Sequence, residues 1–243
     1  MNSRSGQTPF VSSVLLLCLS WATAALADAP TDPYRLTRAS ADGIGKLYMG
    51  REIAQVMGWQ AAAWLERETR EQEERGSLLL RELGLKPGMR VADVGAGTGY
   101  YSRRIAPLVG PAGKVYAVEI QPEMIRMLDA ASKRAGFLNI EPVLGSVDDV
   151  KLGEAAIDLA LMVDVYHELE FPHEMLTSIV RALGPGGRVV FVEYRAEDAQ
   201  VPIKPLHKMS EAQVRLEASQ HALVWERTAN GLPWQHVVIF RKK

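Results

Sequence analysis

The sequence contains a single cysteine, Cys18, among its 243 residues. This cysteine lies inside an apolar N-terminal stretch, so a chain processed after that stretch would contain none. Disulfide bonds, thiolate metal sites and mechanisms with a cysteine nucleophile are therefore excluded for the processed chain. A basic excess is also absent, because 28 Lys and Arg face 29 Asp and Glu. The sequence consequently offers no electrostatic basis for non-specific nucleic-acid binding.

Long apolar runs are absent except for one, from Phe10 to Ala27. The run follows Arg4 and ends in the triplet Ala25-Leu26-Ala27, which is typical of a secretory signal peptide with cleavage before Asp28. The alternative is an uncleaved membrane anchor, because the run approaches the roughly 18–20 residues that span a bilayer. We therefore expect a protein that is exported to the periplasm or secreted, or else anchored by residues 1–27. We expect no other contact with a membrane.

Internal repeats and low-complexity tracts are absent, and short apolar runs alternate with helical segments over most of the chain. The runs that predict strands are Val91–Val94, Val115–Ile120, Ile140–Leu144, Ile157–Val163, Val189–Tyr194, Leu223–Arg227 and His236–Arg241. Helices are predicted from Pro122, from Pro172 and after Ser210, which forms a capping box with Gln213. The last two runs are joined through Asn230-Gly231-Leu232-Pro233, which leaves no room for a helix, so these runs should pair antiparallel.

The predicted fold class is α/β, with a Rossmann-like seven-stranded sheet that is mostly parallel and has an antiparallel C-terminal hairpin strand. Helices are expected on both faces. The main domain should span residues 78–243, preceded by an N-terminal extension of residues 28–77. The apolar spacing of the extension predicts helix in its second half, from Arg51 onward. Three of its residues either pack in the core or cover a ligand site as a lid: Met57, Trp59 and Trp64.

A glycine-rich segment, Val91-Ala92-Asp93-Val94-Gly95-Ala96-Gly97-Thr98-Gly99-Tyr100, includes the first predicted strand and the turn after it. Three glycines at alternate positions allow the backbone to turn tightly and to approach a ligand closely. Ligands of open parallel sheets lie across the carboxyl ends of the strands, where this segment turns. A dinucleotide fingerprint needs glycine where Tyr100 stands, which disfavours a nicotinamide cofactor. Glu119, at the end of the next strand, can accept both hydroxyls of a ribose.

Four segments in this order resemble the class I S-adenosylmethionine-dependent methyltransferases. They are V-A-D-V-G-A-G-T-G-Y, V-Y-A-V-E-I, I-D-L-A-L-M-V-D-V-Y-H-E and the turn L-G-P-G-G-R. The resemblance covers about residues 78–243 and implies S-adenosyl-L-methionine as cofactor. It also implies in-line transfer of its methyl group to a small-molecule or lipid-like acceptor. The alternatives are a non-catalytic scaffold that binds the cofactor and an NAD-dependent oxidoreductase.

The resemblance also assigns cofactor contacts residue by residue. The residues that would hold the methionyl part are Asp93 and, through their backbone, Gly95, Ala96, Gly97, Thr98 and Gly99. Glu119 would bind the ribose, and Ile120 would pack against the adenine. Ser146, Val147 and Asp148 would border the adenine edge, and whether Ser146 or Asp148 meets the adenine amino group stays open.

The acceptor should lie over the ends of the fourth and fifth strands, where a base is useful if a hydroxyl or an acidic carbon is methylated. His167 is the candidate base, with Tyr166 as a wall or hydrogen-bond donor and Asp164 as a third catalytic candidate. Glu168 either orients His167 or begins the next helix. The segment Val201–Lys208 is either a substrate wall or a stiff connection.

Methyl transfer requires no metal, and no metal site is predicted. Three further histidines lack any metal-like grouping in the sequence: His173, His221 and His236.

Overall fold

The fold is taken from a computed structural model, which describes residues 1–2 and 33–243. The expected signal segment and its cleavage point before Asp28 lie outside the described residues. Pro33–Lys243 form one structural unit. Within the described ranges, no helix has both the length and the apolar character that a membrane crossing requires.

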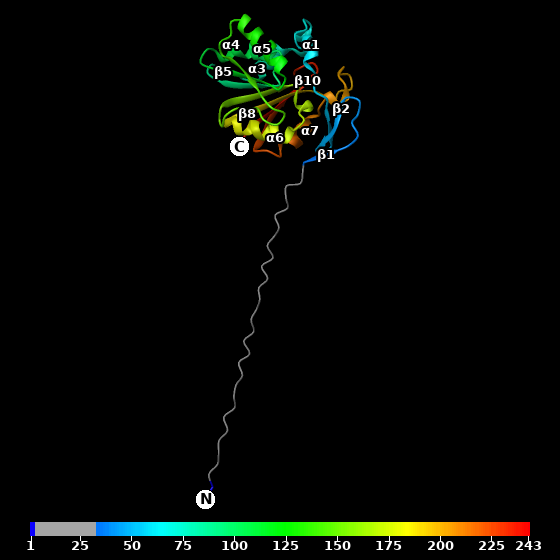
Figure 1. Cartoon of the computed structure of the whole chain (residues 1–243), viewed down its shortest axis with the longest axis vertical. Coiled ribbons are helices and arrows are strands. Elements are labelled where there is room, and N and C mark those ends of the chain that lie inside the picture. Colours follow the sequence, from blue (N-terminus) through cyan, green and yellow to red (C-terminus); the bar gives the residue numbers. More distant parts are fainter. Residues whose placement is uncertain (3–32) are drawn as a thin grey trace. The chain divides into compact units, whose positions relative to one another are not determined.

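The apolar runs form a seven-stranded sheet in the order β6-β5-β4-β7-β8-β10-β9 (Figure 1). Its strands are β4 (Arg90–Val94), β5 (Lys114–Glu119), β6 (Ile140–Leu144), β7 (Ile157–Val163), β8 (Leu183–Tyr194), β9 (Leu223–Ala229) and β10 (Gln235–Lys242). Strands β4 to β8 pair in parallel, whereas β10 runs antiparallel to both β8 and β9. The structure confirms the predicted sheet, including its antiparallel hairpin strand.

Helices cover both faces of the sheet (Figure 1). One face carries α3 (Gly76–Glu82), α4 (Tyr100–Val109) and α5 (Pro122–Arg134), and the other carries α6 (Pro172–Ala182) and α7 (Glu211–Ala218). Strand β7 shows how the sequence supports this arrangement. Leu159 and Leu161 pack with α3 and α4, whereas Ala160 and Met162 pack with α6 and α7. Alternate side chains point to opposite faces of a strand, so a continuous apolar run suits a sheet that is buried on both sides.

The N-terminal extension begins as a three-stranded antiparallel sheet. Its strands are β1 (Tyr34–Leu36), β2 (Gly43–Tyr48) and β3 (Arg51–Ala54). The helix predicted from Arg51 onward is therefore wrong at its start. Met49 and Gly50 have φ values of 47° and 96°, and they join β2 to β3 with Tyr48 opposite Arg51. Two positive φ values are the mark of a type I′ hairpin turn, and methionine is an unusual residue for that backbone region.

Short helical segments follow this sheet instead of one continuous helix. They are η1 (Trp59–Ala61), α1 (Ala62–Leu65) and α2 (Arg70–Glu74). Arg75, with a φ of 52°, separates α2 from α3. The extension is thus helical only in short pieces.

Helix α7 begins at a capping serine, as predicted. Ser210 Oγ accepts the backbone N–H of Gln213 at 3.1 Å. The Gln213 side chain does not complete the capping box, because it donates to the carbonyl of Met49 at 3.2 Å and to Glu217 at 2.8 Å. This glutamine therefore ties the hairpin turn of the extension to α7.

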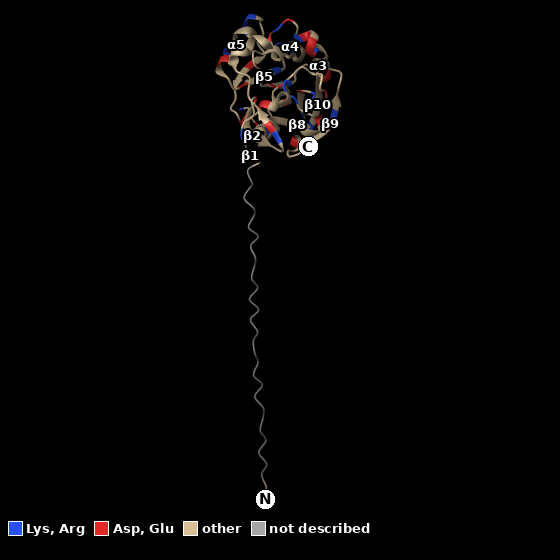
Figure 2. Cartoon of the chain, turned by 90° about the vertical axis from the view of Figure 1, so that its right-hand side faces the viewer, with Lys and Arg blue, Asp and Glu red and all other residues tan. Residues whose placement is uncertain are grey.

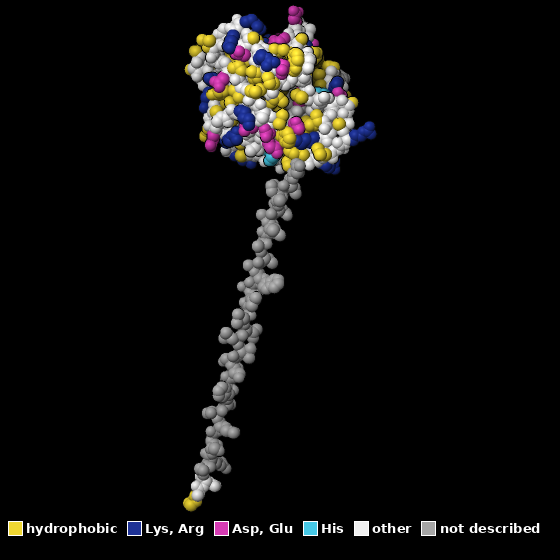
Figure 3. All heavy atoms as spheres, viewed as in Figure 1, with side chains coloured by type: hydrophobic (Ala, Val, Ile, Leu, Met, Phe, Trp, Pro, Cys, Tyr) yellow, Lys and Arg dark blue, Asp and Glu magenta, His cyan; other side chains and the backbone are white. Residues whose placement is uncertain are grey.

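Charges of both signs are interspersed over the surface of residues 33–243 in the views shown. Figure 2 shows Lys and Arg alternating with Asp and Glu among the helices. In Figure 3, hydrophobic side chains lie between charged ones on the face in view. This distribution matches the formal net charge of −1.

A buried ion pair joins the N-terminal sheet to α7. Arg51 donates from Nε to Glu217 Oε1 at 2.7 Å and from Nη2 to Glu217 Oε2 at 3.1 Å. The Glu217 side chain is fully buried. Arg51 also donates from Nη1 to the carbonyl of His167 at 3.1 Å. The extension is therefore fixed to the segment that carries the predicted catalytic residues.

We predict that Glu217→Ala lowers the free energy of unfolding by about 3–5 kcal/mol, because it leaves the Arg51 guanidinium buried without its partner. The double variant Arg51→Met/Glu217→Leu should recover most of that loss, since it removes both charges. Urea denaturation of the three proteins measures the effect. A loss below about 1 kcal/mol in Glu217→Ala would contradict the assignment.

Candidate active site

The glycine loop between β4 and α4 wraps around the end of β5. The N–H groups of Gly95 and Ala96 donate to the carbonyl of Val118 at 2.8 and 3.0 Å. Gly95 and Gly97 have positive φ values, 71° and 54°. A Cβ at Gly95 would lie 2.5 Å from Val165 Cγ2, so neither the backbone conformation nor the space admits a side chain there.

The Glu119 carboxylate lies beside this loop at the end of β5. Its Oε2 accepts the N–H of Gly97 at 3.0 Å, and its Oε1 accepts the N–H groups of Ile120 at 2.7 Å and Gln121 at 2.9 Å. The residue is only 6% exposed. Burial raises the pKa of the Glu119 carboxyl, while the three N–H donors act in the opposite direction. The fold thus holds a carboxylate in a place where ionisation is costly.

Asp93 is a second buried acid, on β4 immediately before the loop. The Ser102 hydroxyl donates to its Oδ2 at 2.6 Å. Burial raises the pKa of Asp93 to about 6, although hydrogen bonds from Ser102 oppose the rise. The ionised form of Asp93 is therefore only partly compensated by its neighbours.

A cavity of about 680 Å³ opens at the carboxyl ends of β4, β5 and β7. Its size lies within the range of about 300–1,000 Å³ that is usual for ligand sites. Most of the lining is apolar, and the polar or ionisable side chains that line it are Arg70, Glu74, Asp93, Tyr100, Tyr101, Glu119, Gln121, Asp164, His167, Glu168, Glu170, Tyr194, Lys204 and His207.

The structure brings most of the predicted site residues to this cavity. Those that line it are Asp93, Gly95, Ala96, Gly97, Glu119, Ile120, Val147, Asp164 and His167. Four of the predicted cofactor contacts lie outside its lining, namely Thr98, Gly99, Ser146 and Asp148. Thr98 Oγ1 donates to Glu66 at 2.5 Å, and Gly99 packs against Leu128. The Ser146 hydroxyl donates to Asp148 Oδ1 at 2.7 Å, and neither residue lines the cavity. Which of the two would meet the adenine amino group therefore stays a prediction.

Tyr166 does not line the cavity, contrary to the expectation that it forms a wall or a donor there. Its side chain is fully buried in the core, 4.9 Å from the ring of Phe191 in an edge-on arrangement. The reason is local, because residues 166–168 form the 3₁₀ helix η2, in which neighbouring side chains point about 120° apart. Tyr166 therefore turns into the core while His167 turns to the cavity.

Two segments with open roles in the sequence also line the cavity. Met57 and Trp64 reach it from the N-terminal extension, whereas Trp59 does not. The Trp59 backbone N–H instead donates to Gln121 Oε1 at 2.8 Å. Of the segment Val201–Lys208, four residues line the wall: Pro202, Ile203, Lys204 and His207. The extension and this segment therefore enclose the cavity from outside the sheet.

A buried charge cluster, which sequence reasoning missed, forms another part of the wall. Arg70 Nε donates to Glu74 Oε2 at 2.8 Å, and the Arg70 guanidinium lies 4.2 Å from the ring centre of Tyr100. Tyr194 OH donates to Glu74 Oε1 at 3.2 Å. Burial, together with the charge of Glu74, raises the pKa of Asp164 well above its usual range. The charged run Glu66–Arg75 is typical of a solvated helix face in the sequence, which is why this cluster was not predicted.

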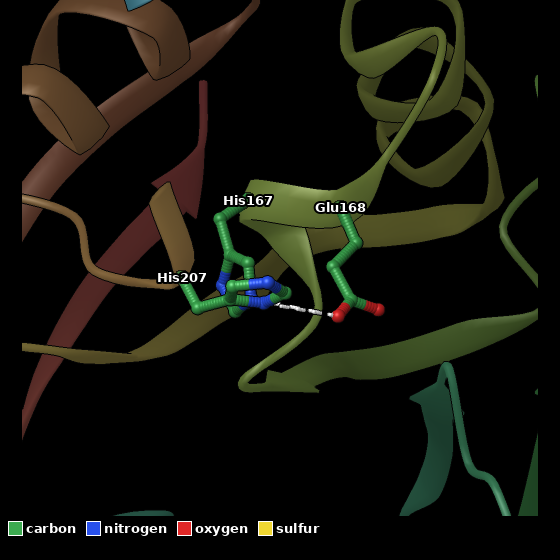
Figure 4. A group of neighbouring side chains, drawn as sticks. All are labelled: His167, Glu168 and His207. Carbon is green, nitrogen blue, oxygen red and sulfur yellow. Dashed lines mark hydrogen bonds and ion pairs between the residues drawn. The ribbon is translucent and has the colours of Figure 1, made fainter. Parts of the chain in front are cut away.

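His167 sits in a polar cluster at the acceptor side of the cavity (Figure 4). Its Nδ1 lies 2.6 Å from Glu193 Oε2, and its Nε2 lies 3.2 Å from His207 Nδ1. Glu193 on β8 is fully buried and also accepts the N–H of Tyr166 at 2.9 Å. Because a carboxylate can only accept, the bond to Glu193 assigns the proton of His167 to Nδ1. The lone pair of His167 Nε2 then points towards His207. His207 belongs to η3 (Pro205–His207), forty residues away in the chain.

We predict that Asp93→Asn stabilises the protein at pH 7 and above. The folded-state pKa of about 6 exceeds the ordinary value of 3.8, so the folded protein holds a proton that the unfolded chain has released between these pH values. Stability therefore falls as the pH rises through this window, and above it the full penalty is present, at most about 3 kcal/mol. The asparagine keeps an acceptor oxygen for Ser102 and carries no charge.

Urea denaturation of both proteins at several pH values between 4 and 8 measures the difference. The stability gain of the variant should grow from pH 4 to pH 6 and stay constant above. A constant difference over the whole range would contradict the role of the Asp93 charge. Ser102→Ala is the matched control, because it removes a hydrogen bond that stabilises the ionised form and should therefore destabilise the protein most at high pH.

A family model described as a methyltransferase domain matches residues 85–237. The crystal structure of a SAM dependent methyltransferase from Aquifex aeolicus superposes with a TM-score of 0.73 at 25% identity, over 77% of this chain and 100% of that chain.

Curated relatives match a shorter stretch. The protein-L-isoaspartate O-methyltransferase of Methanothrix thermoacetophila is 36% identical over 111 residues, which are 44% of this chain and 49% of that protein. The ubiquinone/menaquinone biosynthesis C-methyltransferase UbiE of Ectopseudomonas mendocina is 28% identical over 112 residues, 46% of this chain and 44% of that protein. The chain thus spans about half the length of the curated relatives that it matches. Since the family model covers more than half of the 243 residues and includes all four sequence motifs, the chain belongs to the class I S-adenosylmethionine-dependent methyltransferases.

Proposed function

We propose that this protein transfers the methyl group of S-adenosylmethionine to a small or lipid-like acceptor bound in the same cavity. The observation that supports this most directly is that two kinds of group line one cavity. Glu119 and the glycine loop line one part, and the His167–Glu193 pair reaches another. A cofactor bound by the first part would present its reactive end to a molecule held by the second.

The residues of the first part fit the chemical groups of the cofactor. Glu119 offers a buried carboxylate to a ribose diol, and Asp93 offers one to an ammonium group. At Gly97 a Cβ would meet Leu65 Cδ1 at 2.5 Å, so only a bare backbone leaves the loop open to close approach. When bound, the cofactor supplies a methyl group on a positively charged sulfur, which an acceptor displaces in line.

The second part fits an acceptor that is mostly apolar and carries one polar group. Its apolar lining includes Val56, Met57, Leu169, Pro202 and Ile203. Glu193 fixes the orientation of His167 through the bond to Nδ1, so Nε2 is the atom that takes a proton from an acceptor hydroxyl or acidic carbon, directly or by way of the His207 ring 3.2 Å from it. The buried Asp164, with its raised pKa, adds a group that can donate a hydrogen bond while it is protonated.

Export remains part of the proposal and rests on the sequence of residues 1–27. An exported enzyme would act on molecules that reach the periplasm or the exterior, and it would need cofactor there. That requirement is what keeps a non-catalytic scaffold as the alternative function.

We expect Glu119→Ala to weaken the binding of S-adenosylhomocysteine by more than about 1 kcal/mol, or about fivefold, because charge-assisted hydrogen bonds to the diol are lost. Isothermal titration calorimetry measures this. Glu123→Ala is the matched control, since Glu123 lies in the first turn of α5 and pairs with Arg126 at the surface. Equal affinity of wild type and Glu119→Ala would contradict the role of Glu119 in cofactor binding. Binding of NAD but not of S-adenosylhomocysteine would contradict the proposed reaction.

We expect Glu193→Gln and His167→Ala to lower the rate of methyl transfer by at least about 100-fold, the scale of general acid–base catalysis, with little change in affinity for S-adenosylhomocysteine. Purified protein, methyl-labelled cofactor and a cell extract provide the assay, in which transfer of label to an extractable product is counted. Glu193→Gln keeps the size of the side chain, so it separates chemistry from packing. His173→Ala is the control and should transfer label at the wild-type rate. Absence of label transfer by the wild type would favour the scaffold.

A further inference from the structure

Three metal-ligand atoms from two distant segments converge on one point in the cavity wall (Figure 4). His167 Nε2 lies 3.2 Å from His207 Nδ1. Glu168 Oε1 lies 3.3 Å from His207 Nδ1 and 3.8 Å from His167 Nε2. All three residues line the cavity.

The size of this triangle matches the coordination shell of one metal ion. In a tetrahedral site with metal–ligand bonds of about 2.1 Å, neighbouring ligand atoms are about 3.4 Å apart. The three separations, 3.2, 3.3 and 3.8 Å, bracket that distance. We propose that His167, His207 and Glu168 bind a single divalent metal ion of the Zn²⁺ type.

Hydrogen bonds from neighbouring groups orient two of the three ligands, His167 and Glu168, as is usual for the ligands of a metal ion. Glu193 accepts the Nδ1 proton of His167, and this carboxylate–histidine arrangement fixes the ring and leaves Nε2 unprotonated for a metal. The second oxygen of Glu168 accepts the N–H of Met57 at 3.2 Å, which orients its carboxylate. Arg51 holds the carbonyl of His167. The segment that carries His167 and Glu168 is thus tied to β8, to Met57 and to Arg51 of β3.

A hydrogen-bonded histidine pair is the simpler explanation of the same cluster. In that case a single proton on His207 Nδ1 is shared between His167 Nε2 and Glu168 Oε1. Such a pair satisfies one donor with two acceptors, whereas an ion satisfies all three lone pairs. The two explanations differ in a measurable property, the affinity for a metal.

The ligand set also indicates what the ion would do. Two imidazoles and one carboxylate suit Zn²⁺ and similar ions, and three protein ligands leave a coordination position open, as in catalytic zinc sites. Because the ligands line the cavity, that position faces the acceptor. On the basis of the proposed function, the ion binds the hydroxyl oxygen of the acceptor and lowers its pKa, so that its proton leaves to water. His167 would then serve as a ligand rather than as the base, and the acceptor oxygen would form its bond to the methyl group as the bond from that methyl group to sulfur breaks and S-adenosylhomocysteine leaves.

Titration of the chelator-treated protein with Co²⁺ tests the site, because four- or five-coordinate Co²⁺ absorbs visible light. We expect one ion per chain, displaced by Zn²⁺. His207→Ala should lower the affinity by at least about 100-fold, and Glu193→Gln by about 10–100-fold, the usual effect of removing an outer-shell partner. The His207 side chain is 21% exposed, so its truncation leaves the core intact. Zn²⁺ should raise the midpoint of thermal unfolding of the wild type and leave that of His207→Ala unchanged.

The control is His173→Ala, which removes one histidine of another pair, with ring centres 4.9 Å apart at His173 and His221. It should bind Co²⁺ like the wild type. Equal affinity of wild type and His207→Ala, or loss of binding in His173→Ala instead, would overturn the proposal. S-adenosylhomocysteine affinity, measured on the same samples, separates the two claims. If the protein binds S-adenosylhomocysteine but no metal ion, only the metal site is refuted. If it binds the ion but not S-adenosylhomocysteine, only the proposed methyl transfer is refuted.

Discussion

The hydrogen bond from the Gly97 N–H to the Glu119 carboxylate is the interaction on which the rest of the site depends. It joins the loop after β4 to the end of β5, two strands that pair in parallel with Val94 beside Val118. Parallel pairing brings the two strand ends to one edge, and the glycine conformations let the loop fold back over that edge. Without this bond, the Gly97 N–H would lose its partner and the buried carboxylate would lose one of its three donors.

The site concentrates groups that work against stability. Asp93, Glu119 and Asp164 all have raised pKa values, chiefly because they are buried. Burying a carboxylate without a full counter-charge is unfavourable, and the surrounding sheet tolerates it because both of its faces are packed. Carboxyl groups with shifted pKa values are common at sites that bind a cationic or hydroxyl-bearing ligand.

The parts of the fold that follow a repeating pattern were predictable from the sequence. Continuous β-branched runs, proline and serine at helix starts and a glycine loop each have a local physical cause, and the structure places each element where the pattern predicted it. The hairpin at Met49 was not predictable, because a left-handed methionine leaves no mark in the sequence and Arg51–Ala54 also fits helical spacing. Tyr166 was misplaced for a similar reason, since one step along a 3₁₀ turn decides between core and cavity. The approach of His207 to His167 depends on tertiary packing across forty residues, which local patterns do not encode.

The two halves of the cavity have different origins in the chain. Asp93, the glycine loop and Glu119 belong to the sheet and fall within the segment that matches the family model. Val56, Met57 and Trp64 line the cavity from before that segment begins. Arg51 connects the two parts, because it donates both to Glu217 on α7 and to the carbonyl of His167. If the cofactor is held by the shared sheet, then the choice of acceptor rests largely on the extension and on the Val201–Lys208 segment. Changes in those two segments should alter which molecule is methylated while leaving cofactor binding intact, as follows from a cavity whose two ends are built by separate parts of the chain.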